Sequence, residues 1–178
     1  MNRIELKQRQ VCEALARTQT RFGRTNLTVG RVMTAGPYCV RPETTALELV
    51  KLFHAKQFRH LMVTDEADCL VGVVSDRDVI RCLGPESRPD HDVLEGISAG
   101  EIMSTDLVTV GPDTPLERAV SLMLEEGISS LPVLAGGTLV GILTNTDLHV
   151  VLQQMLLQTL RQSRSEKPGK AGAFNPQD

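Results

Sequence analysis

The sequence contains an internal repeat, and this repeat limits the folds open to the chain more than any other feature. The stretch Val71–Asp78 (VGVVSDRD) returns later as Val140–Asp147 (VGILTNTD). In both copies an apolar run passes through a glycine to a hydroxyl residue, and an aspartate stands three positions further on. One such octet would be a weak signal, but two copies in equivalent places indicate two similarly folded units.

Equivalent residues of the two copies keep a nearly constant separation along the chain. Met33 and Met103 stand 70 residues apart, whereas Asp78 and Asp147 stand 69 apart. The second copy has therefore lost one residue, and the sequence DEAD at 65–68 is replaced there by AGG. Such short polar or glycine-rich stretches predict hairpin turns, which tolerate length changes better than strands do.

Each copy predicts the element order β-α-β-β-α, and hence an α/β fold of the α+β kind. Threonines 44 and 45 can cap a helix, and short apolar runs bounded by turn residues predict the strands. The elements predicted for the first copy are a strand within 37–42, a helix from 44 or 45 to about 56, strands at 61–64 and 70–74, and a helix from 75. Those predicted for the second copy are a strand at 107–110, a helix from 112–114 to about 126, strands at 131–134 and 139–143, and a helix from 144.

The ends and the middle of the chain complete the predicted organisation. Apolar residues at near-heptad spacing predict a helix at 3–17, and the last helix keeps an apolar stripe to Leu160. That stripe is longer than one small repeat can cover, so it packs either on the N-terminal helix or in a dimer interface. The predicted segments are an N-terminal helical segment at 1–28, a first repeat at 29–83, a linker at 84–98, a second repeat with an extended C-terminal helix at 99–160, and a disordered tail at 161–178.

Composition excludes several classes of protein. With 41% hydrophobic residues the chain can bury an ordinary core, and a net charge of −3 gives no reason to expect an obligatory nucleic-acid partner. No apolar run reaches the roughly 20 residues of a membrane span, and the N-terminus lacks the apolar core of a signal peptide. We therefore expect a cytoplasmic protein without a membrane partner. The four cysteines are expected to be buried thiols, not disulfides or metal ligands: Cys12, Cys39, Cys69 and Cys82.

The repeated motifs resemble a tandem pair of CBS domains, the Bateman module. Each copy opens on an apolar residue followed by Met and Thr or Ser, and closes on G-h-h-S/T-x-x-D, where h is apolar. The resemblance covers about residues 29–155. It implies two repeats related by a pseudo-twofold axis, with sheets facing each other and two clefts between them. The matching stretches are V32-M-T34 with G72-VVSDR-D78, I102-M-S104 with G141-ILTNT-D147, and G127-ISSLP-V133.

The resemblance also implies a kind of function. Such modules commonly bind adenosine-containing ligands (AMP, ADP, ATP, S-adenosylmethionine or dinucleotides), often assemble as dimers, and regulate another protein. We therefore expect a stand-alone, homodimeric sensor that acts on a separate effector protein and requires no cofactor. An enzyme is not expected, because no nucleophile elbow, P-loop or metal signature brings the serines and histidines together.

Two aspartates are the first candidate ligand residues. Asp78 and Asp147 stand one turn into helices that begin near Ser75 and Thr144, where a carboxylate can accept both hydroxyls of a ribose. The hydroxyl residues and the helix N–H groups can meet a phosphate. The alternative is that each aspartate only caps its own helix, which contributes about 1 kcal/mol.

Basic residues of the first copy are the candidate phosphate ligands. Arg59 and His60 precede the predicted strand at 61–64, and Arg77 lies within the motif, whereas the second copy has Ser129 and Ser130 in place of the first pair. The remaining motif residues are expected to contact adenine or to form the cleft walls: Val32, Met33, Thr34, Ile102, Met103, Ile128, Ser129, Ser130 and Pro132.

The first copy departs from the family pattern at two positions, where Met62 replaces Pro132 and Gln57 replaces Gly127. These changes weaken the expectation that its cleft holds adenine in the usual way. Two hypotheses remain open. The chain is either a sensor for an adenosine-containing ligand or a dimeric structural or interaction module whose clefts stay empty.

Overall fold

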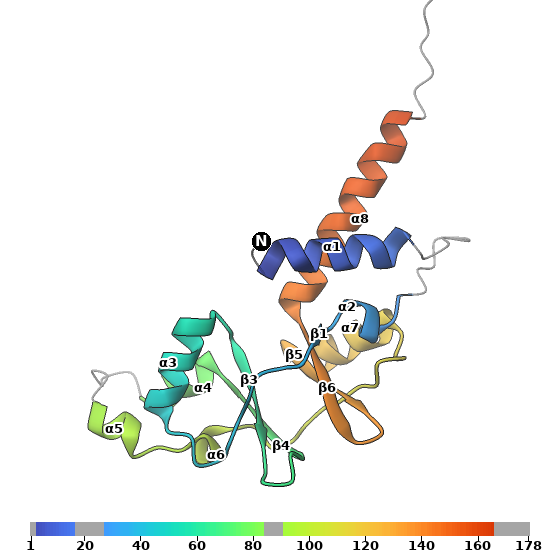
Figure 1. Cartoon of the computed structure of the whole chain (residues 1–178). Helices are drawn as coiled ribbons and strands as arrows, with labels where there is room; N and C mark the ends of the chain where they lie inside the picture. Colours follow the sequence, from blue (N-terminus) through green and yellow to red (C-terminus); the bar gives the residue numbers. More distant parts are fainter. Residues whose placement is uncertain (1–2, 17–26, 84–90, 166–178) are drawn as a thin grey trace, which may run out of the picture.

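The chain folds into two repeats, each built around a small three-stranded sheet (Figure 1). The structure is a computed structural model that describes residues 3–16, 27–83 and 91–165. The helices are α1 (Arg3–Ala16), α2 (Val29–Val32), α3 (Ala46–Lys56), α4 (Asp76–Cys82), α5 (His91–Glu95), α6 (Ala99–Ile102), α7 (Leu116–Glu125) and α8 (Asn145–Ser165). The strands are β1 (Thr34–Ala35), β2 (Cys39–Val40), β3 (His60–Thr64), β4 (Leu70–Ser75), β5 (Ser130–Ala135) and β6 (Thr138–Thr144). Within these residues, no helix combines the length and the apolar content that crossing a bilayer would require.

The segment ahead of each repeat pairs with the sheet of the other repeat. One sheet has the order β2-β3-β4, with β2 parallel to β3 and β3 antiparallel to β4. The other has the order β1-β6-β5, so a strand that precedes the first repeat's own sheet is added to the second repeat. There Thr34 pairs with Ile142. In return Ser104, which is equivalent to Thr34, pairs with Val73 of β4.

The short helices before each repeat are docked on the opposite repeat in the same way. The N–H of Gly30 in α2 donates to the carbonyl of Pro112 at 2.8 Å, and the N–H of Gly100 in α6 donates to the carbonyl of Pro42 at 2.8 Å. Each of these contacts maps onto the other when 70 is added to or subtracted from its residue numbers. The arrangement is the pseudo-twofold relation that the family resemblance implies.

Local sequence accounts for most of the element boundaries. Thr45 caps α3 as predicted, because its Oγ1 accepts from the N–H of Glu48 while Glu48 accepts from the N–H of Thr45. The hairpin between β5 and β6 turns through Gly136 and Gly137, both at positive φ. The longer first-repeat turn, at 65–68, carries the extra residue, so the length difference lies in the turn as predicted.

The strand predicted at 107–110 is wrong. Only Val110 forms a bridge there, to Val133 of β5, whereas the first repeat forms a two-residue strand in the equivalent place. The physical reason lies in β5. In the first repeat the N–H of Met62 donates to the carbonyl of Tyr38 at 3.1 Å, but the equivalent Pro132 has no N–H to donate.

Three further expectations need correction. The predicted linker at 84–98 contains α5, whose Leu94 is buried in the first repeat's core; residues 84–90 lie outside the described residues. The predicted disordered tail begins too early, because α8 continues through Ser165, and 166–178 also lie outside the described residues. The cysteines are not buried, since three of the thiol residues are exposed and Cys82 is half-buried.

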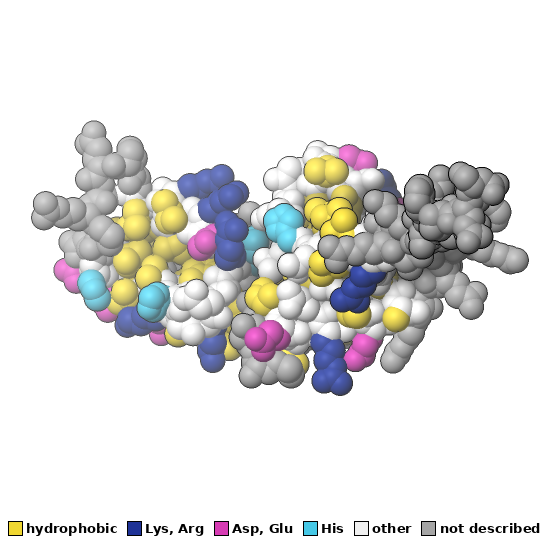
Figure 2. All heavy atoms as spheres, turned by 90° about the horizontal axis from the view of Figure 1, so that it is seen from above, with side chains coloured by type: hydrophobic (Ala, Val, Ile, Leu, Met, Phe, Trp, Pro, Cys, Tyr) yellow, Lys and Arg dark blue, Asp and Glu magenta, His cyan; other side chains and the backbone are white. Residues whose placement is uncertain are grey.

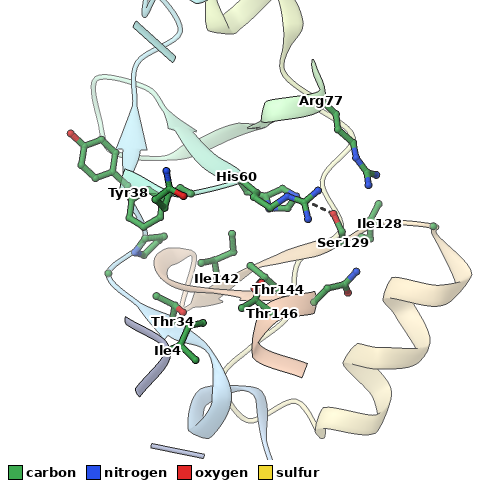
Figure 3. Close-up of a pocket in the computed structure, with 17 residues that line it drawn as sticks. Ile4, Thr34, Tyr38, His60, Arg77, Ile128, Ser129, Ile142, Thr144 and Thr146 are labelled. Carbon is green, nitrogen blue, oxygen red and sulfur yellow. Dashed lines mark hydrogen bonds between the residues drawn. The ribbon is translucent and has the colours of Figure 1, made fainter. Parts of the chain in front are cut away.

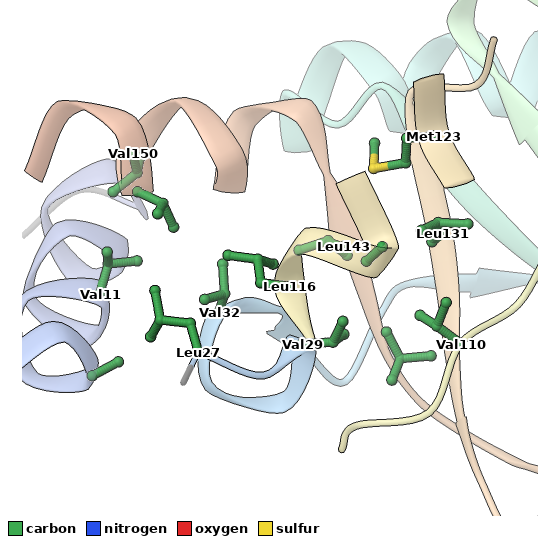
Figure 4. Close-up of a cluster of buried hydrophobic side chains, with 14 of the residues drawn as sticks. Val11, Leu27, Val29, Val32, Val110, Leu116, Met123, Leu131, Leu143 and Val150 are labelled. Carbon is green, nitrogen blue, oxygen red and sulfur yellow. The ribbon is translucent and has the colours of Figure 1, made fainter. Parts of the chain in front are cut away.

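The N-terminal helix belongs to the core of the second repeat. Val11, Ala14 and Leu15 of α1 are buried together with Val150 and Val151 of α8 and the sheet residues beneath them (Figure 4). Part of the apolar stripe on α8 is therefore covered by α1, which lies across it (Figure 1). The rest of the stripe is 39–61% exposed: Leu152, Met155, Leu156, Leu157 and Leu160.

Because each repeat completes the other, we expect damage to one core to loosen both. Leu61→Ala removes a fully buried side chain of the first-repeat core and should lower the free energy of unfolding by about 2–5 kcal/mol. Hydrogen exchange should then rise in β5 and β6 as well as in β3 and β4. An increase confined to β3 and β4 would show that the repeats unfold separately. Leu124→Ala, at a residue 78% exposed, is the control.

Candidate functional site

Two clefts lie between the repeats. The larger cleft, of about 560 Å³, is bordered by the motif that opens α8; the smaller cleft, of about 190 Å³, is bordered by the motif that opens α4. The space-filling view shows a hollow between the two lobes, with basic side chains on its first-repeat side (Figure 2). Residues that line both clefts are Arg59, His60, Arg77, Gly127, Ile128 and Ser129.

The larger cleft is apolar at one end and basic at the other. Tyr38 and Ile4 lie toward one end, and Arg77 lies at the opposite end beside Ser129 (Figure 3). Tyr38 is steadied by Phe58, at 6.0 Å between ring centroids. The lining therefore offers a flat apolar surface and a cationic group to one elongated ligand.

His60 and Ser129 join the two repeats at the point where the clefts meet. Nε2 of His60 lies 3.0 Å from Oγ of Ser129, and both side chains are half-buried. Burial lowers the pKa of His60 from its usual 6.5, while the nearby carboxylate of Asp76 opposes part of this effect. Asp76 itself lies 3.4 Å from Nε of Arg59, which is 60% exposed. The cationic side chains of the site thus remain accessible to a ligand.

Asp78 lines the smaller cleft, as predicted for a ligand residue. Its Oδ2 accepts from the N–H and the hydroxyl of Ser75, at 2.8 and 2.6 Å. Arg81, one turn along the same helix, approaches its other oxygen at 3.5 Å and is itself 78% exposed. The capping contacts are present, and the carboxylate remains 17% exposed toward the cleft.

Asp147 occupies the equivalent position in the second repeat but does not line either cleft. It is 2% exposed, and its Oδ2 accepts from the N–H and hydroxyl of Thr144, both at 2.7 Å. Its Oδ1 accepts from the hydroxyl of Thr34 at 3.2 Å and lies 2.8 Å from Nζ of Lys7 in α1. Every oxygen of this carboxylate is therefore engaged within the protein.

Only some of the predicted cleft-wall residues line a cleft. Thr34, Ile128 and Ser129 line the larger cleft, and the smaller cleft adds Ser130 and Pro132. Thr144 and Ser75, which were predicted as phosphate ligands, line the larger and the smaller cleft respectively. Four predicted wall residues instead lie against the cores: Val32, Met33, Ile102 and Met103. The two methionines cover the glycines of the repeated motif, because a Cβ at Gly72 would collide with Met103 and one at Gly141 with Met33. Their place in the motif therefore reflects packing.

Sequence reasoning missed several lining residues. The repeat itself could have identified some, because adding 70 to the segment from Thr34 to Tyr38 gives 104–108, and both segments line clefts. Ile4 carries no such signal, since it reaches the larger cleft only because α1 packs on the second repeat, and the same packing brings Lys7 to Asp147. Gln57 adopts a left-handed conformation (φ 54°) where the second repeat has Gly127 (φ 64°), so the replacement preserves the backbone.

The buried imidazole predicts a pH-dependent stability. A histidine whose folded pKa lies below 6.5 contributes fully above pH 6.5, and its contribution falls as the pH drops from 6.5 through the folded pKa. His60→Gln keeps a donor for Ser129 but cannot titrate, so the melting temperature should fall less between about pH 7.5 and about pH 5.5 than in the native chain. His54→Gln, which replaces an exposed histidine that lines neither cleft, is the control. The same pH dependence in the His60 variant would contradict this account.

Comparison with known proteins places the chain in a family. The family model described as the CBS domain matches residues 29–84 and again 99–153. An uncharacterized protein of Methanopyrus kandleri is 30% identical over 69% of the chain, which spans 61% of that relative. A homoserine O-acetyltransferase of Methanococcoides burtonii is 29% identical over 70% of the chain, which covers only 24% of that longer protein.

A solved structure gives the same assignment. The crystal structure of CBSX2 in complex with AMP superposes with a TM-score of 0.60 at 33% sequence identity, covering 74% of this chain and 98% of that one. Two matches to the family model, together with the exchanged sheets and the paired clefts, lead to one conclusion. The chain belongs to the CBS domain family and contains a tandem pair of these domains.

Proposed function

We propose that this chain is a regulatory module that binds an adenosine-containing ligand in the larger cleft and transmits its occupancy to a separate effector protein. The observation that carries the proposal is the polarity of this cleft, apolar at Tyr38 and cationic at Arg77 (Figure 3). Its volume of about 560 Å³ suits a nucleotide, because small-molecule sites measure roughly 300–1,000 Å³. The relative CBSX2, solved with AMP, supports the ligand class.

The base and the phosphates have distinct places in this proposal. The purine lies at the apolar end, against Tyr38 and Ile142, where the phenol ring offers a stacking surface. The phosphates lie at the other end, where Arg59 and Arg77 can each form charge-assisted hydrogen bonds. The start of the long helix α8, at Asn145, adds the positive end of the helix dipole.

The role proposed for the module is regulation and not catalysis. The cleft offers binding groups, and the proposal assigns neither a reaction nor a required cofactor to them. AMP, ADP, ATP and S-adenosylmethionine are the ligand candidates, and occupancy acts by favouring one arrangement of the terminal helices over another. The alternative function is a dimeric structural or interaction module with empty clefts. It is favoured by the capping contacts that engage both Asp78 and Asp147 without any ligand.

A ligand screen tests the proposal. At about 100 times its dissociation constant, a ligand that binds only the folded state adds about 2.7 kcal/mol of stability, which raises the melting temperature. We expect this with at least one of AMP, ADP, ATP and S-adenosylmethionine, and not with GTP. Replacing both Arg59 and Arg77 by Gln should weaken a phosphate-bearing ligand by at least about tenfold in titration calorimetry.

The control for that experiment is Arg118→Gln, which removes an exposed arginine of α7 that lines neither cleft. It should bind as the native chain does. A well-folded protein that responds to none of the four compounds would favour the empty-cleft module. Equal affinity of the double variant and the control would show that the two arginines do not bind the phosphates.

We further propose that the chain forms a homodimer through the exposed part of α8. Leu152, Leu156 and Leu160 recur at four-residue spacing along α8, and each is at least 55% exposed. The later turns of this helix extend past α1 (Figure 1). A stripe of this kind on a helix that projects from the fold buries its apolar surface when two copies pair. Leu156→Glu should therefore convert the dimer to a monomer in sedimentation equilibrium.

A matched control is Leu124→Glu, which places the same charge on an exposed leucine of α7. It should leave the dimer intact. A native chain that is monomeric at about 100 μM, a concentration well above the dissociation constants of stable dimers, would contradict the proposal. If the Leu124 variant is monomeric and the Leu156 variant is still a dimer, the dimer interface lies on the helices of the repeats and not on α8.

A further inference from the structure

The N-terminal helix closes off one of the two motif carboxylates. Nζ of Lys7 lies 2.8 Å from Oδ1 of Asp147, and the two side chains are 9% and 2% exposed. Lys7 also donates to the carbonyl of Val32, which holds the ammonium group in place. A residue three positions earlier on the same helix, Ile4, forms part of the wall of the larger cleft (Figure 3). Helix α1 is therefore both a wall of this cleft and a cover for its aspartate.

The smaller cleft lacks this arrangement, although its motif is equivalent. Asp78 is 17% exposed and lines its cleft, and the cation near it, Arg81, belongs to the same helix and is 78% exposed. The cation that faces Asp147, Lys7, comes instead from a segment outside the repeat. The pseudo-twofold relation makes Asp78 and Asp147 equivalent, so the difference in their exposure arises from α1.

The two halves of α1 are held unequally. Val11 and Leu15 are buried in the second-repeat core, whereas Ile4 and Leu6 are 42% and 52% exposed. Polar contacts of the first half, such as those from Gln8 to Gln153 and from Gln10 to the carbonyl of Arg31, are exposed and can be exchanged for water. Lys7 is the buried polar anchor of the first two turns, so loss of its contact with Asp147 allows these turns to separate from the site while the last two stay anchored.

We propose that the first half of α1 is an internal competitor for the larger cleft. In this proposal, which rests on the proposed function, Lys7 satisfies the carboxylate of Asp147 in the absence of ligand. The two hydroxyls of a ribose replace the ammonium group when the ligand binds, because a buried carboxylate needs a donor in either state. Docking of residues 3–10 and binding of the nucleoside then exclude one another.

This exclusion supplies the signal that a sensor requires. By linkage, the factor by which docked α1 weakens the ligand equals the factor by which bound ligand weakens the docking of α1. Release of the first turns changes the surface beside Gln153 on α8. An effector protein that distinguishes docked from released α1 would read out the ligand.

The first test compares matched alanine variants of α1, with AMP as the probe in titration calorimetry. Lys7→Ala removes the competitor, so it should bind AMP about tenfold more tightly than the native chain, within the usual range of coupling between sites. Arg9→Ala removes a cation from the same helix, but that residue is 73% exposed and pairs only with Glu13 among the ion pairs of the described chain. It should bind as the native chain does.

The second test uses the native chain and remains decisive if the Lys7 variant fails to fold. Hydrogen exchange with and without saturating AMP should show faster exchange in residues 3–10 when AMP is bound, and slower exchange at the start of α8. Slower or unchanged exchange in residues 3–10 would contradict the proposal that the first half of α1 competes with the ligand. Equal AMP affinity of the native chain and the Lys7 variant would also overturn it, while the proposed function would stand. If neither chain binds AMP, ADP, ATP or S-adenosylmethionine at millimolar concentration, both the competitor and the proposed function are overturned.

Discussion

The exchange of the lead-in segments between the repeats is the constraint on which the rest of the structure depends. Helices α2 and α6 each place a glycine N–H on a proline carbonyl of the opposite repeat, and each is followed by a residue that pairs with the opposite sheet. The second repeat's sheet takes strand β1 from the segment ahead of the first repeat, and the first repeat's sheet gains a bridge from Ser104. The same exchange brings Thr34 to 3.2 Å from Asp147, so the candidate site is a product of the interlocking and not of one repeat alone.

The pseudo-symmetry of the backbone is broken by side-chain charge, and this gives the clefts different chemistry. The first repeat has Arg59 and His60 where the second has serines, and Arg77 where the second has Thr146. These three side chains line both clefts. Arg59 and Arg77 therefore border both clefts, and on the proposed function phosphates bound in both clefts would compete for them.

Sequence predicted what is encoded locally. The helix caps, the hairpins and the fold class were available from short patterns and a repeated order, and Asp78 was correctly placed at a cleft. Long-range contacts were not available. Nothing local connects Lys7 with Asp147, 140 positions away, and the packing of Met33 over Gly141 could not be told from ligand contact by its motif. The strand at 107–110 was wrongly predicted because its local sequence does not show its pairing partner. That partner, Pro132, has no N–H group for the hydrogen bond that a strand here would require.

Helix α8 connects the motif aspartate of the second repeat, the contact with α1 and the exposed leucines. Its first turn carries Asp147, its second packs Val150 and Val151 against α1, and its later turns carry the exposed leucines. On the proposed function, ligand and α1 therefore act on the same helix that presents the dimer surface. A change at Asp147 needs to travel only along one continuous, hydrogen-bonded element to reach that surface. On the proposed dimer, α8 would connect the cleft with the assembly through one packed element, because binding in the cleft and pairing of two copies would both bias the equilibrium between docked and released α1.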